Sequence, residues 1–398
     1  MESNLPSFAP FFTWGNRGRI LYSPGASAEI AFELEQLGAS RPLVITDKGV
    51  AGAGIADQVV QKLEKSGLGI AGLYDNVLQD ARIENINSAA EFYRDVRADS
   101  LIALGGGSVL DTAKAVNILI GMGVDDFKPL ADQAALWEDA IPLPPHIALP
   151  TTAGTGCEVT NVIVVFDSES KVKVAVTHPL CNADISILDP ELTVKLPPKI
   201  TAFTGMDALT HAVEGITSTG AQPISDALGL HAIRLIVHSL PIAVSRPDNI
   251  EARGNMLIAA TIAGMCFCNS MLGAAHATAH ALGALYGIPH GLANAVMLPF
   301  VMEYNLEEAI DQYSMIAQAL GTSLDRGFSL ENALTAVEGV KKLKKEVGLT
   351  QTLSDFDVPS DPEKLSDLVE LAAGDSQISY NPRPLDETDI LELYLKAL

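Results

Sequence analysis

The sequence predicts an α/β amino-terminal domain, in which helices cover a mostly parallel sheet, followed by an all-helical domain. Three observations lead to this prediction. Short apolar segments alternate with segments of helical spacing through the first half of the chain. The segment KLPPK at 195–199 contains two consecutive prolines, which neither a helix nor a strand can continue. Beyond it, no segment has the pattern of a strand. The predicted domains are therefore 1–196 and 197–398.

The predicted strands of the first domain are short and apolar. Helices are predicted at 55–66 and 85–97, and from the glycine-rich turn at 105–108 to residue 120. The turn-rich sequence DSES between two of the strands predicts a hairpin. Alternation of strands and helices is typical of a sheet that is covered on both faces. The strands are predicted at 42–46, 100–104, 147–149, 162–166, 172–177 and 185–188.

The second domain is predicted to contain only helices. Its most apolar segment, 256–275, contains the polar Thr261, Asn269 and Ser270 and many small residues. We therefore expect a helix in the core of a soluble domain there, rather than a membrane span. The helices are predicted at 201–219, 223–246, 251–272, 274–286, 292–303, 306–320, 329–347, 361–373 and 386–397.

The composition excludes several classes of function. Hydrophobic residues make up 48% of the 398 residues and charged residues 19%, so we expect a packed interior rather than disorder. The net charge of −23 disfavours binding to nucleic acid or to anionic membranes. Four cysteines are too few for a disulfide framework, and no basic region precedes an apolar stretch at the start. These features predict a cytoplasmic protein with a small-molecule substrate and no nucleic-acid or membrane partner.

A glycine-rich turn connects a predicted strand to a predicted helix. It consists of Gly105, Gly106, Gly107 and Ser108. Backbone N–H groups at the start of a helix bind phosphate, and glycine lets the ligand approach the backbone closely. The usual dinucleotide fingerprint is not met, because Leu110 stands at the position of its third glycine. The turn predicts phosphate binding, with a purely structural tight turn as the alternative.

Two further polar positions fit a dinucleotide. Asp47 follows the strand 42–46, where an acidic group accepts hydrogen bonds from a ribose and repels a 2′-phosphate. Together with the glycine-rich turn it favours NAD over NADP, and a helix cap is its alternative role. The second is TTAGTG at 151–156, whose hydroxyls and backbone donors suit a pyrophosphate or a nicotinamide amide. The same sequence also fits an ordinary polar turn.

Five ionisable residues of the second domain predict a metal site. Asp207 and His211 are four residues apart and share one helix face, as do His276 and His280, and His290 follows shortly after. Buried ionisable groups must be paired or bound to metal, and His with Asp suits Fe²⁺ or Zn²⁺. The spacing leaves open which residues are ligands, and His280 is either a ligand or a proton relay. The remaining histidines are interpreted as ordinary core or surface residues: His146, His178, His231 and His238.

Six long motifs stand in a fixed order along nearly the whole chain. They are ALGGGSVLDTAKA at 103–115, LPTTAGTGCEVT at 149–160, ILDPELTVKLPP at 187–198, GMDALTHAVEG at 205–215, HATAHALGALYGIPHGLANAVMLP at 276–299 and NPRPLDETDI at 381–390. In these residues the chain resembles the iron-containing (group III) alcohol dehydrogenase family. This family includes lactaldehyde reductases, butanol dehydrogenases and propanediol dehydrogenases.

The resemblance implies a dehydroquinate synthase-like fold with the active site in the cleft between the two domains. It implies that His280 is a non-ligand histidine near the nicotinamide, that Asp47 favours NAD, and that Phe267 lies in the substrate pocket. The implied metal ligands are Asp207, His211, His276 and His290. Gly105, Gly106, Gly107 and Ser108 match the pyrophosphate loop, and Thr151, Thr152, Thr155, Val164 and Lys173 match positions that line the cofactor site.

The implied function is hydride transfer between NAD(H) and a small primary alcohol or diol. In this mechanism Fe²⁺ acts as a Lewis acid on the alcohol oxygen, with Zn²⁺ or another divalent ion as alternatives. The alternative function is that of a hydroxyacid–oxoacid transhydrogenase or a dehydroquinate-synthase-like lyase, both of which retain NAD. Relatives are usually dimers or larger assemblies. We therefore expect a homodimer or larger homo-oligomer, in which the apolar stretch 8–14 contacts a partner subunit.

The chain departs from the family pattern at a few positions. Gln79 and Asp80 stand where relatives commonly have Asn-Pro, which concerns contacts around the adenosine half of the cofactor. Cys157, Cys266 and Cys268 are less common variants. The last two are two residues apart on a predicted helix and point to opposite sides, so no disulfide is expected between them.

Overall fold

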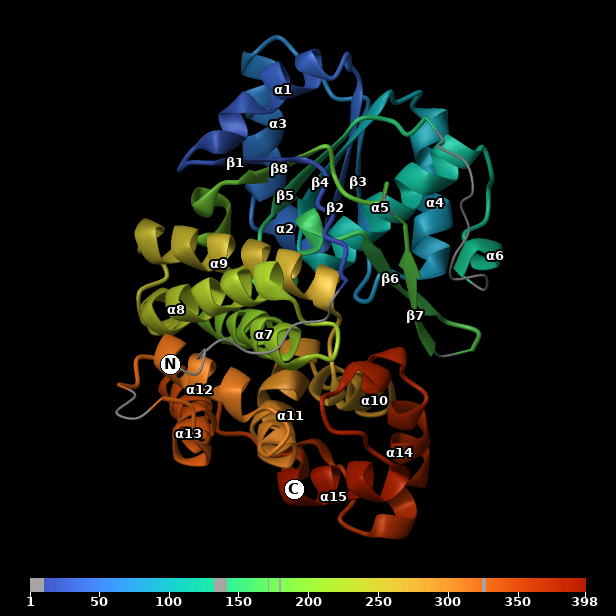
Figure 1. Ribbon diagram of the computed structural model, residues 1–398. Coiled ribbons are helices and arrows are strands. Elements are labelled where there is room, and N and C mark those ends of the chain that lie inside the picture. Colours follow the sequence, from blue (N-terminus) through green and yellow to red (C-terminus); the bar gives the residue numbers. More distant parts are fainter. Residues whose placement is uncertain (1–10, 132–141, 171, 179, 324–326) are drawn as a thin grey trace. The chain divides into compact units, whose positions relative to one another are not determined.

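The computed structural model describes residues 11–131, 142–170, 172–178, 180–323 and 327–398. Residues 8–10 of the stretch predicted to contact a partner lie outside these ranges. The chain forms two compact units (Figure 1). We call Asn16–Thr152 with Gly156–Leu196 the sheet unit. The helical unit comprises Ala153–Thr155, Pro197–Leu398 and the described residues before Asn16. The predicted fold class, an α/β part followed by a mostly helical part, is confirmed.

The sheet unit contains a parallel sheet of six strands in the order β1-β8-β5-β4-β2-β3. A separate antiparallel hairpin pairs β6 with β7, as the sequence predicts. The strands of the sheet are β1 (Arg19–Tyr22), β2 (Pro42–Asp47), β3 (Gly72–Val77), β4 (Ser100–Gly105), β5 (His146–Pro150) and β8 (Ile185–Leu188). The hairpin strands are β6 (Val162–Asp167) and β7 (Val172–Thr177).

Helices cover both faces of this sheet because its central strands carry apolar side chains on both sides. In β2, Leu43 and Ile45 belong to one hydrophobic core and Val44 to the other, as alternation along a strand requires. The core around Leu43 is closed by α4 (Ile83–Asp95) and α5 (Gly107–Met122). The core around Val44 is closed by α1 (Ile30–Gln36) and α3 (Ile55–Lys65). Two short helices, α2 (Lys48–Gly52) and α6 (Lys128–Ala131), complete the unit within its described residues.

The sequence prediction lacks the two edge strands, β1 and β3. The residues of β1 are mostly exposed, and those of β3 are mostly half-buried and include Asp75 and Asn76. Strands in the middle of a parallel sheet are apolar on both faces and are recognised as continuous apolar runs. An edge strand has fewer buried side chains, so its sequence lacks that signal.

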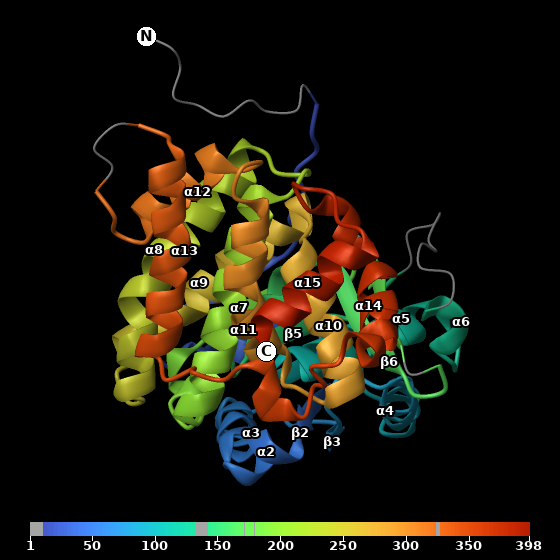
Figure 2. The same cartoon turned by 90° about the horizontal axis from the view of Figure 1, so that it is seen from below.

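The helical unit carries the predicted metal-site residues on α7, α10 and α11. In this unit α7, α8 and α9 pack against one another. Figure 2 shows α11 close to α7, α10 and α15, with which it is in contact. The helices are α7 (Pro198–Thr217), α8 (Pro223–Ser245), α9 (Ile250–Ser270), α10 (Ala274–Tyr286), α11 (His290–Asn305), α12 (Ile310–Ala319), α13 (Leu330–Glu346), α14 (Ser366–Ala373) and α15 (Glu387–Ala397).

Two glycines let these helices approach closely enough to bring their polar side chains together. A Cβ atom on Gly291 of α11 would lie 2.3 Å from the carbonyl oxygen of Phe203 on α7. A Cβ atom on Gly215 of α7 would lie 2.6 Å from Cys266 Sγ on α9. Any other residue would push α11 or α9 away from α7. The position of α7 against its neighbours therefore depends on both glycines.

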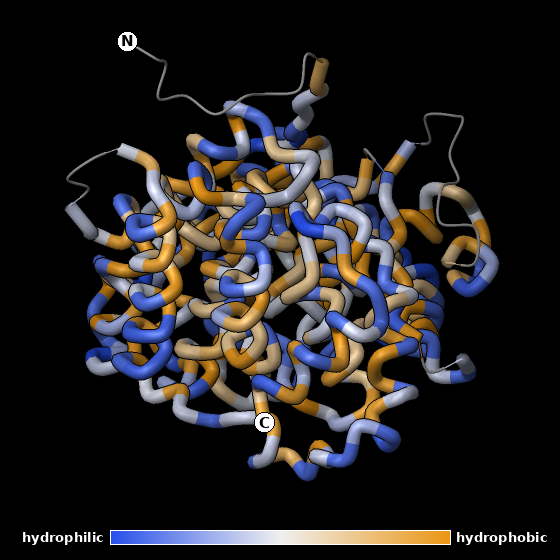
Figure 3. The backbone as a smooth tube through the Cα atoms, turned by 60° about the horizontal axis from the view of Figure 1, so that its bottom comes forward, coloured by the Kyte–Doolittle hydropathy of each residue, from blue (hydrophilic) through white to orange (hydrophobic). Residues whose placement is uncertain are grey.

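The apolar segment 256–275 is not one straight helix. It includes the end of α9 and the start of α10, which meet at an angle of 105°. Between them, Met271 has a φ of 69°. By length and hydropathy α8 alone, or α9 and α10 taken as one bent pair, passes the test for a membrane span among the described helices. Buried core helices pass the same test, and hydrophobic and hydrophilic residues are interspersed along the chain in Figure 3.

Candidate active site

Four side chains of the helical unit converge in a group that can hold a metal ion. Asp207 and His211 come from α7, His276 from α10, and His290 is the first residue of α11. One ligand atom from each lies within 4.8 Å of those of the other three. Asp207 Oδ1 is 3.4 Å from His290 Nε2 and 3.8 Å from His276 Nε2. The first three residues are buried and His290 is half-buried, so one side of the group is accessible.

Two imidazole rings of this group, those of His211 and His276, are stacked. The ring centroid of His211 lies 4.6 Å from that of His276 and 4.4 Å from that of Phe267 on α9. Burial, together with the neighbouring charge of His211, lowers the pKa of His276 well below its ordinary value. A neutral imidazole has a lone pair to offer a metal ion. The ring of Phe267, the predicted substrate-pocket residue, stacks on His211 and so lies directly against the group.

Glu214 fixes the orientation of His276 from the side opposite Asp207. It lies on α7 one turn beyond His211, and its Oε2 is 2.5 Å from His276 Nδ1. Its Oε1 accepts a hydrogen bond of 2.7 Å from the backbone N–H of Ala275. Burial raises the pKa of Glu214 to about 7. With the shared proton on Nδ1, the lone pair of His276 Nε2 is directed toward Asp207, and such carboxylate–histidine pairs orient metal ligands.

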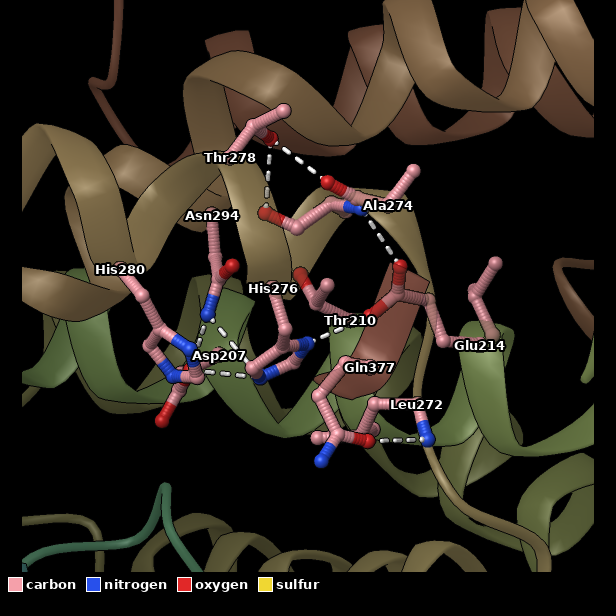
Figure 4. A network of polar contacts seen from close by, with 12 residues as sticks. Asp207, Thr210, Glu214, Leu272, Ala274, His276, Thr278, His280, Asn294 and Gln377 are labelled. Carbon is pink, nitrogen blue, oxygen red and sulfur yellow. Dashed lines mark hydrogen bonds and ion pairs between the residues drawn. The ribbon is translucent and has the colours of Figure 1, made fainter. Parts of the chain in front are cut away.

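Asn294 reaches the same point from α11, one turn after His290. Its Nδ2 lies 2.8 Å from Asp207 Oδ1, 3.1 Å from His276 Nε2 and 3.3 Å from His290 Nε2. Figure 4 shows its amide directed at Asp207 and His276. The amide hydrogens carry partial positive charge and point at the three atoms just named, which are the atoms that would bind a cation. Three of the four ligand atoms thus point inward toward one place.

The chemistry of these donors fits a divalent first-row metal. Three imidazole nitrogens and one carboxylate oxygen form a ligand set suited to Fe²⁺ or Zn²⁺. Among the described residues, buried His211 Nδ1 has no hydrogen-bond partner. A buried polar atom without a partner is costly in a folded protein, and metal coordination of the ring would offset that cost. The residues present therefore fit the ion that the sequence predicts.

His280 lies beside the group but is held by a different partner. Its Nδ1 is 2.7 Å from Asp375 Oδ2, and its ring stacks on that of His290 with a centroid distance of 5.2 Å. Burial would raise the pKa of Asp375, but the hydrogen bond from His280 lowers it below the ordinary value. Asp375 also accepts a hydrogen bond from the backbone N–H of Gln377. With Nδ1 engaged, Nε2 is the nitrogen of His280 that can exchange a proton.

The glycine-rich turn lies in the sheet unit between β4, which ends at Gly105, and α5, which begins at Gly107. No side chain caps the start of α5 in the described part of the chain. A Cβ atom on Gly105 would lie 2.6 Å from Val109 Cβ, and one on Gly106 would lie 3.2 Å from the Thr152 side chain. Glycine is therefore required by the packing, and the first N–H groups of this 16-residue helix can bind an anion.

The other predicted cofactor residues are spread over several elements. The backbone N–H of Thr151 donates a 3.0 Å hydrogen bond to Gly105 O, so 151–152 lie against the glycine-rich turn. Val164 pairs with Ala175 in the hairpin. Lys173 on β7 forms an ion pair with Asp80.

Asp47 is the last residue of β2, and Thr155 lies in the segment that follows β5. Asp47 caps α2, because its Oδ1 accepts a hydrogen bond of 2.9 Å from the backbone N–H of Val50. Asp47 thus has the helix-cap role that the sequence offers as an alternative. The cap uses Oδ1, so Oδ2 can accept a hydrogen bond from another partner. Thr155 belongs to Ala153–Thr155, which is part of the helical unit.

Sequence reasoning missed three residues of the site: Glu214, Asn294 and Asp375. Glu214 follows His211 by three residues and Asn294 follows His290 by four, both within apolar helices. The rule that identified the histidine pairs, polar side chains at helical spacing on a buried face, would have found both. Asp375 is 95 residues from His280 along the chain. Short spacing cannot reveal such a pair, which requires the tertiary structure.

Family models match both units of the chain. Residues 17–190 match the iron-containing alcohol dehydrogenase model, and residues 201–398 match the model of the Fe-containing alcohol dehydrogenase family, C-terminal. The chain belongs to the iron-containing alcohol dehydrogenase family. The resemblance predicted from the motifs is thereby confirmed. The donor group on α7, α10 and α11 lies within the part of this dehydrogenase that matches the C-terminal model.

Curated relatives match this dehydrogenase over nearly their full length. It is 35% identical to the 1,3-propanediol dehydrogenase of Citrobacter freundii over 94% of this chain and 96% of the relative. It is 36% identical to the lactaldehyde reductase of Escherichia coli K12 over 94% of this chain and 97% of the relative.

Solved structures show the same fold. A 1,3-propanediol oxidoreductase has a TM-score of 0.92 at 34% identity and covers 98% of this chain and 100% of its own. A sulfoacetaldehyde reductase from Bifidobacterium kashiwanohense, solved in complex with NAD⁺, has a TM-score of 0.87 at 29% identity and covers 98% and 99%. This chain is thus an oxidoreductase of the kind that acts on alcohols and aldehydes.

Replacing Glu214 with glutamine is expected to weaken metal binding by about 10- to 100-fold, as for other partners of metal-binding histidines. Glutamine keeps the size but loses the negative charge opposite His276 Nδ1. Metal content after competition with a graded chelator measures the change. Glu251→Gln, at an exposed position in the first turn of α9, is the matched control. Equal metal affinity of Glu214→Gln and the control would show that Glu214 does not act through His276.

Proposed function

We propose that this dehydrogenase transfers hydride between NAD(H) and small primary alcohols, diols and their aldehydes, with Fe²⁺ as its metal. The observation that carries the proposal is the convergence of one carboxylate and three imidazoles in a member of this family. The proposed ligands are Asp207, His211, His276 and His290. Zn²⁺ or another divalent ion is the alternative to Fe²⁺, because the same donors suit both.

The residues around the group have different roles in the proposed reaction. A divalent ion in this site supplies Lewis acidity to the alcohol oxygen. Glu214 keeps His276 Nε2 available as a donor atom. We assign to His280 the transfer of the hydroxyl proton toward solvent, because Asp375 holds its Nδ1 and Nε2 is then the nitrogen that exchanges the proton. Phe267 supplies an apolar surface next to His211, which suits the carbon chain of a small substrate.

The proposed cofactor is NAD, bound at the glycine-rich turn. The uncapped start of α5 provides N–H groups for the pyrophosphate, and glycines at 105 and 106 keep the backbone accessible. Asp47 Oδ2 is proposed to accept a hydrogen bond from a ribose hydroxyl. The NAD⁺ complex of the sulfoacetaldehyde reductase supports this choice of cofactor. The other proposed cofactor contacts are Gly107, Ser108, Thr151, Thr152, Thr155, Val164 and Lys173.

The proposal also covers the size of the substrate, the domains, the location of the enzyme and its oligomeric state. The two curated relatives described above are named for a diol and for lactaldehyde, which supports a small polar substrate. The two domains are proposed to be 1–196 and 197–398. A cytoplasmic location without nucleic-acid or membrane contacts is proposed from the composition, including the net charge of −23. A homodimer or larger homo-oligomer is proposed from the family resemblance.

A panel assay tests the proposed reaction. Protein reconstituted anaerobically with Fe²⁺ is mixed with NAD⁺ and short primary alcohols, diols or hydroxyacids, and with NADH and aldehydes. We expect the absorbance of NADH to rise with alcohols or diols and to fall with their aldehydes. If the protein holds metal and tightly bound NAD but the NADH absorbance changes with none of these compounds, the enzyme is instead a transhydrogenase or a lyase.

Replacing Asp47 with glycine is expected to raise the ratio of kcat/KM with NADP⁺ to that with NAD⁺ by about tenfold or more, because a carboxylate repels a 2′-phosphate. Asp47→Asn is the matched variant, since its side-chain oxygen can still cap α2 while the charge is lost. Both variants should shift the ratio. If neither does, Asp47 is a helix cap without a role in cofactor choice.

A further inference from the structure

The loop between β3 and α4 has an unusual backbone at two consecutive residues. Asp80 has a φ of 71° and Ala81 a φ of 45°. Left-handed backbone is unfavourable for residues with a Cβ, and aspartate tolerates it better than most. Such conformations persist only where the surroundings hold them, and they are common at functional sites. The loop therefore needs contacts that fix it.

Contacts to β6 and to the glycine-rich turn hold this loop in place. The backbone N–H of Asp80 donates a 3.0 Å hydrogen bond to Ser108 Oγ in the first turn of α5. The carbonyl oxygen of Ala81 accepts a hydrogen bond of 3.3 Å from Phe166 N. The guanidinium of Arg82 lies 5.6 Å from the centre of the Phe166 ring. The Ser108 hydroxyl accepts from Asp80, so its own proton remains available to an anion at the start of α5.

The carboxylate of Asp80 binds the ammonium of Lys173. Asp80 Oδ1 is 2.8 Å from Lys173 Nζ, and the Lys173 side chain is only 15% exposed. Lys173 lies on β7 directly across from Phe166, the residue that also binds the loop. A lysine side chain has many rotamers, and an ion pair restricts them. One residue, Asp80, therefore joins Lys173 to Ser108 at the predicted phosphate-binding turn.

We propose that Asp80 is a positioning residue for the dinucleotide: it holds the Lys173 ammonium beside Ser108, ready for an oxygen of the cofactor. Its backbone N–H sets the position of the Ser108 hydroxyl in the same way. This inference rests on the proposed function, in which the glycine-rich turn binds NAD(H).

Fluorescence titration with NADH measures the effect without turnover. Asp80→Asn keeps the backbone N–H and tolerates the left-handed backbone but loses the charge, and we expect its Kd for NADH to rise about fivefold. Lys173→Met should raise the Kd by about tenfold or more, because a charge-assisted contact is lost. The double variant should bind no more weakly than Lys173→Met, since Asp80 acts through Lys173.

Two controls separate positioning from folding. Asp80→Gly relieves the strain of the left-handed backbone and also removes the carboxylate. Its Kd for NADH should therefore match that of Asp80→Asn if the negative charge is what holds Lys173. Asp75→Asn breaks a comparable surface ion pair with Lys48 and should leave the Kd unchanged. In steady-state assays Asp80→Asn should raise KM for NAD⁺ and leave kcat and KM for the alcohol unchanged, which a general loss of stability would not do.

The outcomes distinguish this inference from the proposed function. Wild-type affinity in Asp80→Asn, or additive losses in the double variant, would overturn the role of Asp80 while leaving NAD binding intact. Absence of NADH binding by the wild-type protein would overturn the proposed cofactor and this inference with it. An Asp80→Asn protein weakened in NADH binding, with losses that do not add to those of Lys173→Met, supports it.

Discussion

Replacing His276 with alanine is expected to remove the metal ion and to abolish alcohol oxidation. His276 is fully buried, and its Nε2 lies among the converging donor atoms while Glu214 holds its Nδ1. Alanine deletes one of the four proposed ligands, and three donors form a much weaker site than four. Metal content by elemental analysis and kcat should fall together, with kcat below about a thousandth of the wild-type value.

A histidine elsewhere in the helical unit controls for this result. His231→Ala changes an exposed residue of α8 and should leave metal content and kcat unchanged. The melting temperature of His276→Ala should resemble that of wild-type protein from which the metal has been removed. A His276→Ala enzyme that is fully active and replete with metal would end the assignment of the site.

Replacing His280 with alanine is expected to lower kcat by about 10² to 10⁴ while the metal stays bound, because general acid–base groups contribute rate enhancements of that size. His280 stacks on His290 but is paired with Asp375, outside the four-residue group. Steady-state kinetics and elemental analysis on the same sample measure both quantities. Added imidazole should restore part of the activity, since it can enter the space left by the ring and carry the proton.

The opposite pattern identifies a different role for His280. If His280→Ala loses its metal in proportion to its activity, His280 is a ligand rather than a proton relay. Asp375→Asn provides the supporting measurement, because it keeps the shape of the partner but removes the charge that holds Nδ1. It should retain metal and lose part of kcat, by less than His280→Ala does.

The sequence predicts those parts of the fold whose signals are local. The strands β2, β4, β5 and β8 are apolar runs because both of their faces are buried, and they were predicted within a few residues. The edge strands β1 and β3 lack that signal. The bend of 105° between α9 and α10 also could not be predicted from the periodicity of apolar residues. It arises at Met271, whose backbone conformation no local pattern indicates.

The site residues also divide into those with a local sequence signal and those that only the tertiary structure reveals. Helical spacing placed Asp207 beside His211 and His276 beside His280, and the structure brings Asp207, His211 and His276 together with His290. Spacing could not say which of the five residues form the group of four, because that depends on how α7, α10 and α11 cross. The ligand set came from the family resemblance. Asp375, which holds His280, was invisible in the sequence because the two elements are distant along the chain.

Metal titration of the metal-free enzyme tests directly whether a metal ion held by the four-residue group carries the reaction. Protein stripped with a chelator is supplied anaerobically with increasing Fe²⁺, and NADH formation from NAD⁺ and a short diol or primary alcohol is followed by absorbance. We expect no turnover without metal and a linear rise in rate that ends at one ion per chain, and we expect no such rise in His276→Ala. Full NADH formation by metal-free protein would contradict it.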